Sequence, residues 1–301
     1  MSDFVQQQHS VSEFSSSDSW IILSPIEQSI KRKIEAVGTP LKDWDIKICR
    51  GVLTGCNEAF IISTEKRDEI LNNCITDEER KRTAELIRPI LRGRDIKRYG
   101  YEWAGLWLIN THNGVKGVIP RININNYPAV KQHLDKYWDK IEKRTDQGDT
   151  PYNLRNCAYL DDFNKPKIVY IEIMTDNEIE GYPFPCFSYD NKRSIVLNTG
   201  YIMTSETIRM KAILAILNSR VGRFMLKLFV SQLQQRQFRM LRQYMDNVPL
   251  PRLNDDTMKK LTELAEKCMT GDKKAERMID VLLYESYQLS EEEIMLVTNF
   301  D

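Results

Sequence analysis

The chain has few of the residues that metal centres, disulfide scaffolds and membrane spans require. Its 301 residues include three histidines and six cysteines, and no two cysteines form a Cys-x-x-Cys pair. This pattern predicts reduced thiols and no metal site. No apolar run approaches the roughly 20 residues that span a bilayer, and residues 1–23 are rich in serine and glutamine. We therefore expect a flexible leader over residues 1–23, no membrane contact and a cytoplasmic protein.

Two kinds of catalytic loop are also missing. A DNA amino-methyltransferase needs an Asn/Asp-Pro-Pro-Tyr/Phe loop for the flipped base and a glycine-rich strand-to-helix turn for S-adenosylmethionine, and the sequence contains neither. Asp45-Ile-Lys47 and Asp95-Ile-Lys97 fit the short acid-x-lysine pattern of magnesium-dependent nucleases, but so short a pattern recurs by chance. We expect Asp95 to pair with neighbouring arginines instead. The sequence thus predicts no catalytic residue, metal or cofactor in this chain, and a stand-alone nuclease is the weakest alternative.

A global basic field is absent as well. The chain has 43 basic and 43 acidic residues, so any site for a polyanion has to come from local segregation of charge. Residues 207–252 contain nine basic residues and one acid, whereas residues 255–301 contain twelve acids and six bases. This separation favours a single DNA-binding face.

The densest group of cations lies between residues 88 and 98. The guanidinium group of arginine can donate two hydrogen bonds at once to a phosphate or to the edge of guanine. A glycine lets the backbone approach a ligand closely. A nucleic-acid backbone is therefore the candidate ligand, and a solvated helix end is the alternative. The turn contains five cations, one glycine and one acid, namely Arg88, Arg92, Gly93, Arg94, Asp95, Lys97 and Arg98.

Two further segments carry polar side chains that suit DNA. Thr54 and Asn57 lie in a glycine-containing turn, where the amides would meet phosphate or Asn57 would cap the turn. Residues 231–239 contain four glutamines and two arginines, which suit base edges or else form a polar interdomain surface. The candidate DNA-binding residues are Arg92, Arg94, Lys97, Arg98, Thr54, Asn57, Gln234, Gln235, Arg236 and Arg239.

Capping signals and hydrophobic periodicity predict an α+β fold. Capping boxes begin helices at Ser24, Thr76 and Ser290, and a helical stripe of apolar residues predicts one long helix over residues 205–230. We expect a mixed central sheet with flanking helices in a target-recognition domain over residues 24–252, followed by a helical segment over residues 253–301. Strands are expected over 45–50, 59–62, 106–109, 167–173, 186–189, 194–197 and 201–204.

Six blocks, in this order, resemble the TaqI-like C-terminal specificity domain. The tail 279–294 is similar to the ending of type IIG restriction-modification polypeptides. The blocks are residues 47–62 (KICRGVLTGCNEAFII), 90–99 (ILRGRDIKRY), 165–170 (KPKIVY), 197–201 (LNTGY), 214–219 (LAILNS) and 248–251 (VPLP).

The resemblance implies that the chain recognises a target sequence in duplex DNA. It implies a parent polypeptide in which a linked methyltransferase modifies an adenine and a linked nuclease cuts, with S-adenosylmethionine and magnesium bound only in those catalytic domains. The alternative is a protein-interaction or spacer module that docks on methyltransferase or nuclease subunits, as in the related type I specificity subunits.

Overall fold

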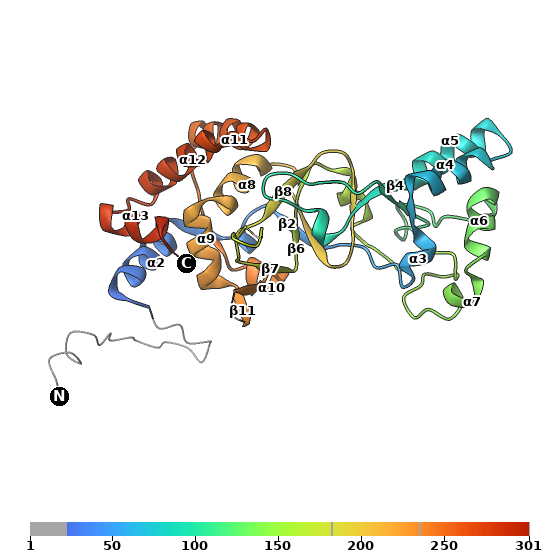
Figure 1. The fold of residues 1–301 in the computed structure, drawn as a ribbon, viewed down its shortest axis with the longest axis horizontal. Helices are drawn as coiled ribbons and strands as arrows, with labels where there is room; N and C mark the ends of the chain where they lie inside the picture. Colours follow the sequence, from blue (N-terminus) through green and yellow to red (C-terminus); the bar gives the residue numbers. More distant parts are fainter. Residues whose placement is uncertain (1–22, 182, 235, 301) are drawn as a thin grey trace. The chain divides into compact units, whose positions relative to one another are not determined.

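The computed structural model describes residues 23–181, 183–234 and 236–300, so residues 1–22 of the expected leader lie outside the described residues. The chain forms two compact units, each built from segments that are separate in the sequence. The sheet unit consists of residues 46–172 and 186–210, and the helical unit consists of the described parts of 1–45, 173–185 and 211–301. The predicted α+β class with a helical C-terminal segment is confirmed (Figure 1). The domain boundaries at residues 24 and 252 stay predictions.

Two four-stranded sheets form the core of the sheet unit. One is antiparallel in the order β2-β10-β6-β8, and the other has the order β3-β5-β4-β9 and is mixed, because β4 and β9 run parallel. The expected strands thus divide between two sheets. The chain passes from β9 in one sheet to β10 in the other through a turn, in which the Gly200 amide donates to the Leu197 carbonyl at 2.8 Å. The bounds are β2 Lys47–Arg50, β3 Ile61–Ser63, β4 Ile87–Leu91, β5 Leu106–Ile109, β6 Lys167–Ile171, β8 Phe187–Asp190, β9 Ile195–Val196 and β10 Gly200–Thr204.

Short helices cover the end of the sheet unit that carries β3, β4 and β5. The strand expected over residues 59–62 begins as α3 and becomes extended only from Ile61. The capping box expected at Thr76 is only half formed: Thr76 accepts from the Glu79 amide at 3.1 Å, but the Glu79 carboxylate accepts from the amides of Ile75 at 2.9 Å and Ala129 at 3.0 Å. Glu79 thereby joins the start of α5 to that of α6. The bounds are α3 Asn57–Phe60, α4 Thr64–Asn72, α5 Asp77–Leu86, α6 Pro128–Asp135 and α7 Trp138–Ile141.

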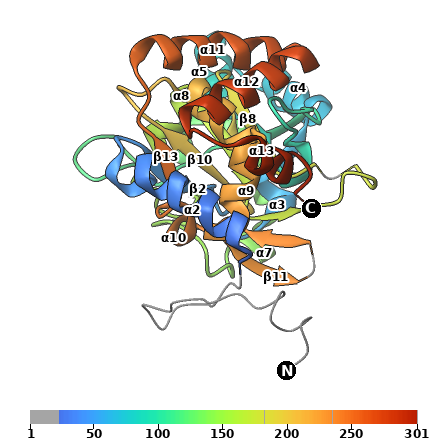
Figure 2. The ribbon, with the colours of Figure 1, turned by 90° about the vertical axis from the view of Figure 1, so that its left-hand side faces the viewer.

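The helical unit consists of seven helices in the described residues and two small sheets, one pairing β1 with β13 and one in the order β11-β12-β7. Figure 2 shows α11 and α12 side by side. The expected capping boxes at Ser24 and Ser290 are confirmed. The bounds are α2 Pro25–Val37, β1 Gly38–Pro40, β7 Ile173–Thr175, α8 Met210–Asn218, α9 Arg220–Phe229, β11 Ser231–Gln234, β12 Gln237–Arg239, α10 Arg242–Met245, β13 Pro249–Pro251, α11 Asp255–Met269, α12 Lys273–Ser286 and α13 Glu291–Thr298.

The long helix predicted over residues 205–230 is wrong, because Ser219 divides it into α8 and α9. The Ser219 hydroxyl donates to the Ile216 carbonyl at 2.7 Å and accepts from the Gly222 amide at 2.9 Å. The hydroxyl therefore caps a new helix instead of continuing the old one. Gly222 makes the break possible, since a Cβ atom there would lie 2.3 Å from the Ile216 carbonyl oxygen. Hydrophobic periodicity continues across the break, which is why it predicted one helix.

No helix in the described part of the chain is both long and apolar enough to cross a membrane.

A fully buried ion pair joins β6 to β8. Lys167 and Asp190 are both 0% exposed, and their Nζ and Oδ2 atoms lie 2.5 Å apart. Asp190 also accepts from the Tyr101 hydroxyl at 2.8 Å and from the Ser194 hydroxyl at 3.0 Å, while Lys167 donates to the Phe163 carbonyl at 3.0 Å. Burial by itself would raise the pKa of Asp190, but Lys167 and these donors hold it below its usual range.

We predict that Lys167→Met lowers the free energy of unfolding by about 3–5 kcal/mol, because it leaves Asp190 charged and buried. The double variant Lys167→Met/Asp190→Asn should recover most of this loss. Urea denaturation measures both, with Lys131→Met as a control at an exposed pair with Asp135, where a change of about 0–1 kcal/mol is expected. A loss for Lys167→Met no larger than that of the control would contradict the prediction.

Candidate functional site

The turn that contains most of the predicted cations is organised by Asp95. This residue ends a single 3₁₀ turn, Gly93–Asp95, and is 3% exposed. Its carboxylate accepts from the Arg92 backbone amide at 2.8 Å, from Arg92 Nε at 3.1 Å and from Arg92 Nη2 at 2.7 Å. The expected pairing of Asp95 with a neighbouring arginine is therefore confirmed, and the hydrogen bonds that Arg92 donates to Asp95 raise the pKa of Arg92.

The other cations of this turn differ in how freely they can meet a ligand. Arg88 donates to Asn164 Oδ1 at 3.0 Å and to the Arg193 carbonyl. Arg98 lies 5.2 Å from the centroid of the Tyr99 ring. Lys97 is half exposed, with its Nζ 3.7 Å from a carboxylate oxygen of Glu102.

Arg94 is exposed, and its side chain forms no hydrogen bond or ion pair within the part of the chain that the structure describes. Arg94 and Lys97 are thus the side chains of this turn best placed to meet an anion.

The turn that precedes α3 is held from inside by Arg144. The guanidinium of Arg144, 7% exposed, donates to the carbonyls of Thr54 and Asn153 and, at 3.0 Å each, to those of Asp146 and Pro151. It also lies 4.5 Å from the centroid of the Phe60 ring. Burial lowers the pKa of Arg144 to about 10, so it remains charged at neutral pH. The charge is dispersed over four backbone dipoles rather than paired with a carboxylate.

Thr54 and Asn57, the two candidates in this turn, face different surroundings. Thr54 is 1% exposed, and its hydroxyl donates to Asn57 Oδ1 at 2.5 Å and accepts from the Cys56 amide at 3.3 Å. Asn57 is exposed as the first residue of α3, and its Nδ2 forms no hydrogen bond among the described residues. Thr54 therefore shapes the turn from within, while Asn57 presents an amide to solvent.

The glutamine-rich candidates lie in the helical unit, on the hairpin of β11 and β12. Gln234 and Arg236 are exposed at its tip, and Arg236 adopts the left-handed conformation, with φ of 68°. The backbone carbonyl of Arg236 accepts from the Asp176 amide at 2.7 Å. Arg239 is half-buried on β12. Gln235 lies outside the described residues. The ten candidates are thus divided between the two units.

Local pairing neutralises part of the basic segment over residues 207–252, and the single DNA-binding face expected from it stays a prediction. Asp176, far from this segment in sequence, pairs with Arg223 and Lys227, at 2.7 Å in each case. Arg252 donates to the Asp43 carbonyl and lies over the Trp44 ring. Further ion pairs of the segment are Lys211–Glu266, Arg220–Asp280 and Arg242–Asp246. Except for Asp246, the acids of these pairs come from other segments, so the local charge count did not show them.

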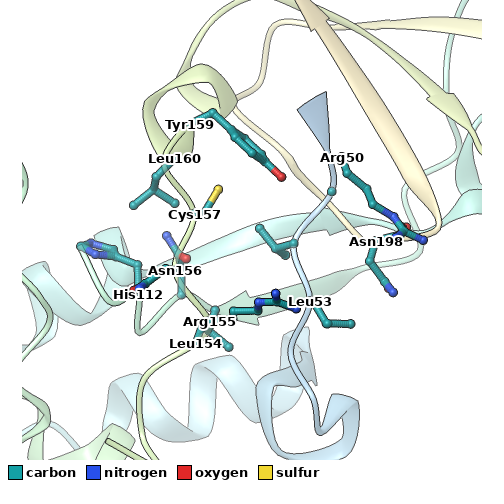
Figure 3. A pocket seen from close by; sticks show the side chains of 13 residues that line it. Arg50, Leu53, His112, Leu154, Arg155, Asn156, Cys157, Tyr159, Leu160 and Asn198 are labelled. Carbon is teal, nitrogen blue, oxygen red and sulfur yellow. The ribbon is translucent and has the colours of Figure 1, made fainter. Parts of the chain in front are cut away.

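The sheet unit also contains a pocket that no motif in the sequence predicted. Its cavity volume is about 250 Å³. Figure 3 shows Tyr159, Cys157 and Asn156 along one wall. Opposite this wall runs the segment from Arg50, the last residue of β2, to Leu53. The full lining comprises Arg50, Gly51, Val52, Leu53, Asn110, His112, Leu154, Arg155, Asn156, Cys157, Tyr159, Leu160 and Asn198.

The pocket does not fit S-adenosylmethionine. Its lining contains no carboxylate to accept from ribose hydroxyls. The neighbouring turn from β2 to α3 differs from a nucleotide-binding unit, because β2 pairs only antiparallel and α3 has four residues. No group of three or more His, Cys, Asp or Glu side chains in the described residues could hold a metal ion.

The sequence model of the TaqI-like C-terminal specificity domain matches residues 88–250, which include the Asp95 turn, part of the pocket and the β11–β12 hairpin. The chain belongs to this family. The predicted resemblance is therefore confirmed over this range; Thr54, Asn57 and the acidic tail lie outside it.

Two longer proteins are similar to this chain. The type II methyltransferase M.PaeR7I of Pseudomonas aeruginosa is 23% identical over 279 residues, covering 91% of this chain and 44% of its own length. A structure of the type IIL restriction-modification enzyme MmeI in complex with DNA shares the fold, with a TM-score of 0.58 and 13% identity, over 87% of this chain and 35% of that chain. The chain thus spans less than half of either relative.

We predict that Arg144→Met destabilises the turn over residues 51–57, because it leaves buried carbonyl groups without hydrogen-bond donors. Each carbonyl that water does not reach lowers the free energy of unfolding by about 1–3 kcal/mol. Amide hydrogen exchange should show faster exchange at Cys56, and urea denaturation should show a loss of at least about 2 kcal/mol. Arg121→Met, at an exposed pair with Asp149, is the control. Unchanged exchange at Cys56 would show that Arg144 does not hold this turn.

Proposed function

We propose that this chain recognises a specific sequence in duplex DNA as the specificity part of a longer restriction-modification protein. Membership of the TaqI-like specificity domain family carries the proposal. The geometry supports it, because the Arg92–Asp95 pair fixes a turn from which Arg94 extends without an internal partner among the described residues. An arginine whose backbone is fixed and whose guanidinium group has no internal partner is available to read guanine or to contact phosphate.

The candidate residues of the sheet unit would have different roles in DNA binding. Arg94 would read a base edge, and Lys97, with a flexible stem and a point charge, would contact phosphate. Arg92 would orient the turn through Asp95, and Arg98 would act close to the Tyr99 ring. The exposed amide of Asn57 suits adenine, while Thr54 would act through the conformation of its turn.

The hairpin at Gln234, Gln235, Arg236 and Arg239 would form a second contact surface, on the helical unit. Its exposed glutamine and arginine side chains offer several donors for base edges or phosphates.

The parent protein would combine an adenine N6 methyltransferase with an endonuclease of type IIG. The methyltransferase part of this proposal is supported by the similarity to a type II methyltransferase of about twice the length of this chain. The adenine, endonuclease and type IIG parts rest on the family resemblance of the sequence blocks and of the tail 279–294. S-adenosylmethionine and magnesium would then bind to covalently linked catalytic domains. Because the pocket does not fit S-adenosylmethionine, we propose no catalytic step for this chain.

Exposed apolar side chains favour a second candidate function, the docking of the helical unit on another protein part. Met278 and Val281, one helical turn apart on α12, are 48% and 53% exposed, and Met295 on α13 is 62% exposed. Such a module would bind a methyltransferase or nuclease subunit rather than DNA.

We expect the isolated chain to bind duplex DNA weakly, with an affinity that falls as salt rises, because bound lysine and arginine release counterions from phosphates. Fluorescence anisotropy of a labelled duplex at 50 and 200 mM salt measures the slope. Absence of binding at low salt would favour the docking module instead.

We further expect Arg94→Ala to weaken binding of the cognate duplex by about 1–3 kcal/mol in the parent enzyme and to relax specificity at one base pair. Lys97→Ala should weaken binding to all sequences alike and reduce the salt slope by about one. Arg277→Ala, which removes an exposed arginine from α12, controls for net charge. If Arg94→Ala weakens binding to every sequence only as much as Arg277→Ala does, Arg94 does not read a base.

A further inference from the structure

The loop between β8 and β9 presents two adjacent cations that no sequence motif singled out. Lys192 and Arg193 are both exposed, and within the part of the chain that the structure describes neither side chain forms a hydrogen bond or an ion pair. Other exposed arginines of the sheet unit, Arg50, Arg121 and Arg155, each pair with an acid. Two neighbouring like charges without such a partner repel each other, and an external anion would relieve the repulsion.

The backbone of this loop is held by the buried Asp190. The Asp190 carboxylate accepts from the Lys192 amide at 3.2 Å, from the Ser194 amide at 3.0 Å and from the Ser194 hydroxyl at 3.0 Å. Asp190 is in turn paired with Lys167 in the core of the sheet. The two exposed side chains therefore extend from a fixed backbone, so less conformational freedom is lost when they bind a ligand.

Arg193 has a backbone conformation that suits glycine better than arginine. Its φ is 58°, in the left-handed region, and the Arg88 guanidinium holds this conformation by donating to the Arg193 carbonyl. Residues in strained conformations persist where their surroundings hold them, and they gather at binding sites. Because glycine adopts this conformation without a steric cost, the presence of an arginine here indicates a use for its side chain rather than a need of the fold.

The charges beside this loop favour an anionic ligand. Burial and the positive charge of Arg193 lower the pKa of Arg88, while Asp190 acts in the opposite direction. The charge of Asp190 is already compensated, because its Oδ2 lies 2.5 Å from Lys167 Nζ. A phosphate offers several acceptor oxygens, which suit both a guanidinium fork and an ammonium group.

We propose that Lys192 and Arg193 bind phosphates of the DNA backbone. The proposal rests on the proposed function, since duplex DNA supplies the phosphates, and it adds a second contact loop to the sheet unit. Arg88 lies on β4 and Arg92 begins the Asp95 turn after it. Four residues of extended chain span roughly 13 Å, so the two groups of cations would contact different phosphates.

Fluorescence anisotropy of the full chain with two labelled duplexes of unrelated sequence tests this loop. Arg193→Gly removes the cation and suits the left-handed backbone. It should weaken binding to both duplexes by about threefold or more at low salt and reduce the salt slope by about one. Its Tm should not fall, because glycine adopts this conformation readily. Lys192→Ala should have the same effect on binding and on the salt slope.

Two further variants separate a phosphate contact from a change in net charge. Arg193→Lys keeps the charge and should keep the salt slope. Lys116→Ala, which removes an exposed cation from the same unit, should leave affinity and slope unchanged. Combined with Lys97→Ala, Arg193→Gly should reduce the salt slope by about two, because different phosphates are contacted.

Unchanged binding and slope in both Arg193→Gly and Lys192→Ala, with a wild-type chain that binds duplex, would overturn this loop as a contact and leave the proposed function standing. Weaker binding to only one of the two duplexes would overturn the phosphate assignment. A wild-type chain that binds neither duplex at low salt would overturn both the proposed function and this contact. If Arg193→Gly lowers Tm, Lys192→Ala decides the outcome.

Discussion

The buried ion pair of Lys167 and Asp190 is the interaction on which the sheet unit depends. Two charges fully removed from water are tolerable only when each is also hydrogen-bonded, and Asp190 accepts from Tyr101 and Ser194 as well as from Lys167. Tyr101 closely follows the Asp95 turn, and the Tyr99 amide donates to the Phe187 carbonyl at 2.8 Å on β8. The exposed cations at Arg94 and Lys97 therefore extend from a turn that is fixed to the core of the sheet.

Arginines serve two distinct purposes in this chain. Arg92, Arg144 and Arg223 are held by acids or backbone carbonyls. Arg94 and Arg236 are exposed, without side-chain partners in the described residues. A guanidinium group has five donors, so a buried one can satisfy several carbonyls at once, as Arg144 does. The number of arginines in a segment is thus a poor measure of the charge that it offers to DNA.

The two candidate binding features of the sheet unit are electrostatically different. The Asp95 turn presents Arg94, whose side chain has no partner among the described residues, beside Lys97, which lies near Glu102. This surface suits attraction to phosphate and reading of guanine. The pocket is lined instead by Arg50 and Arg155, which both pair with acids, and by Cys157, whose thiol has a pKa raised by burial.

The sequence by itself determined the family, the α+β class, the helix starts at Ser24 and Ser290 and the pairing of Asp95 with a neighbouring arginine. All of these depend on residues a few positions apart, where capping, turn formation and local ion pairing operate. Tertiary structure decided which charges are neutralised, because Asp176 reaches Arg223 and Lys227 from another segment. It also divided the expected long helix at Ser219, where the serine hydroxyl competes with the helical backbone for hydrogen bonds. It buried the Asn110 side chain without a partner for its Oδ1, because burial depends on contacts between residues that are distant in sequence.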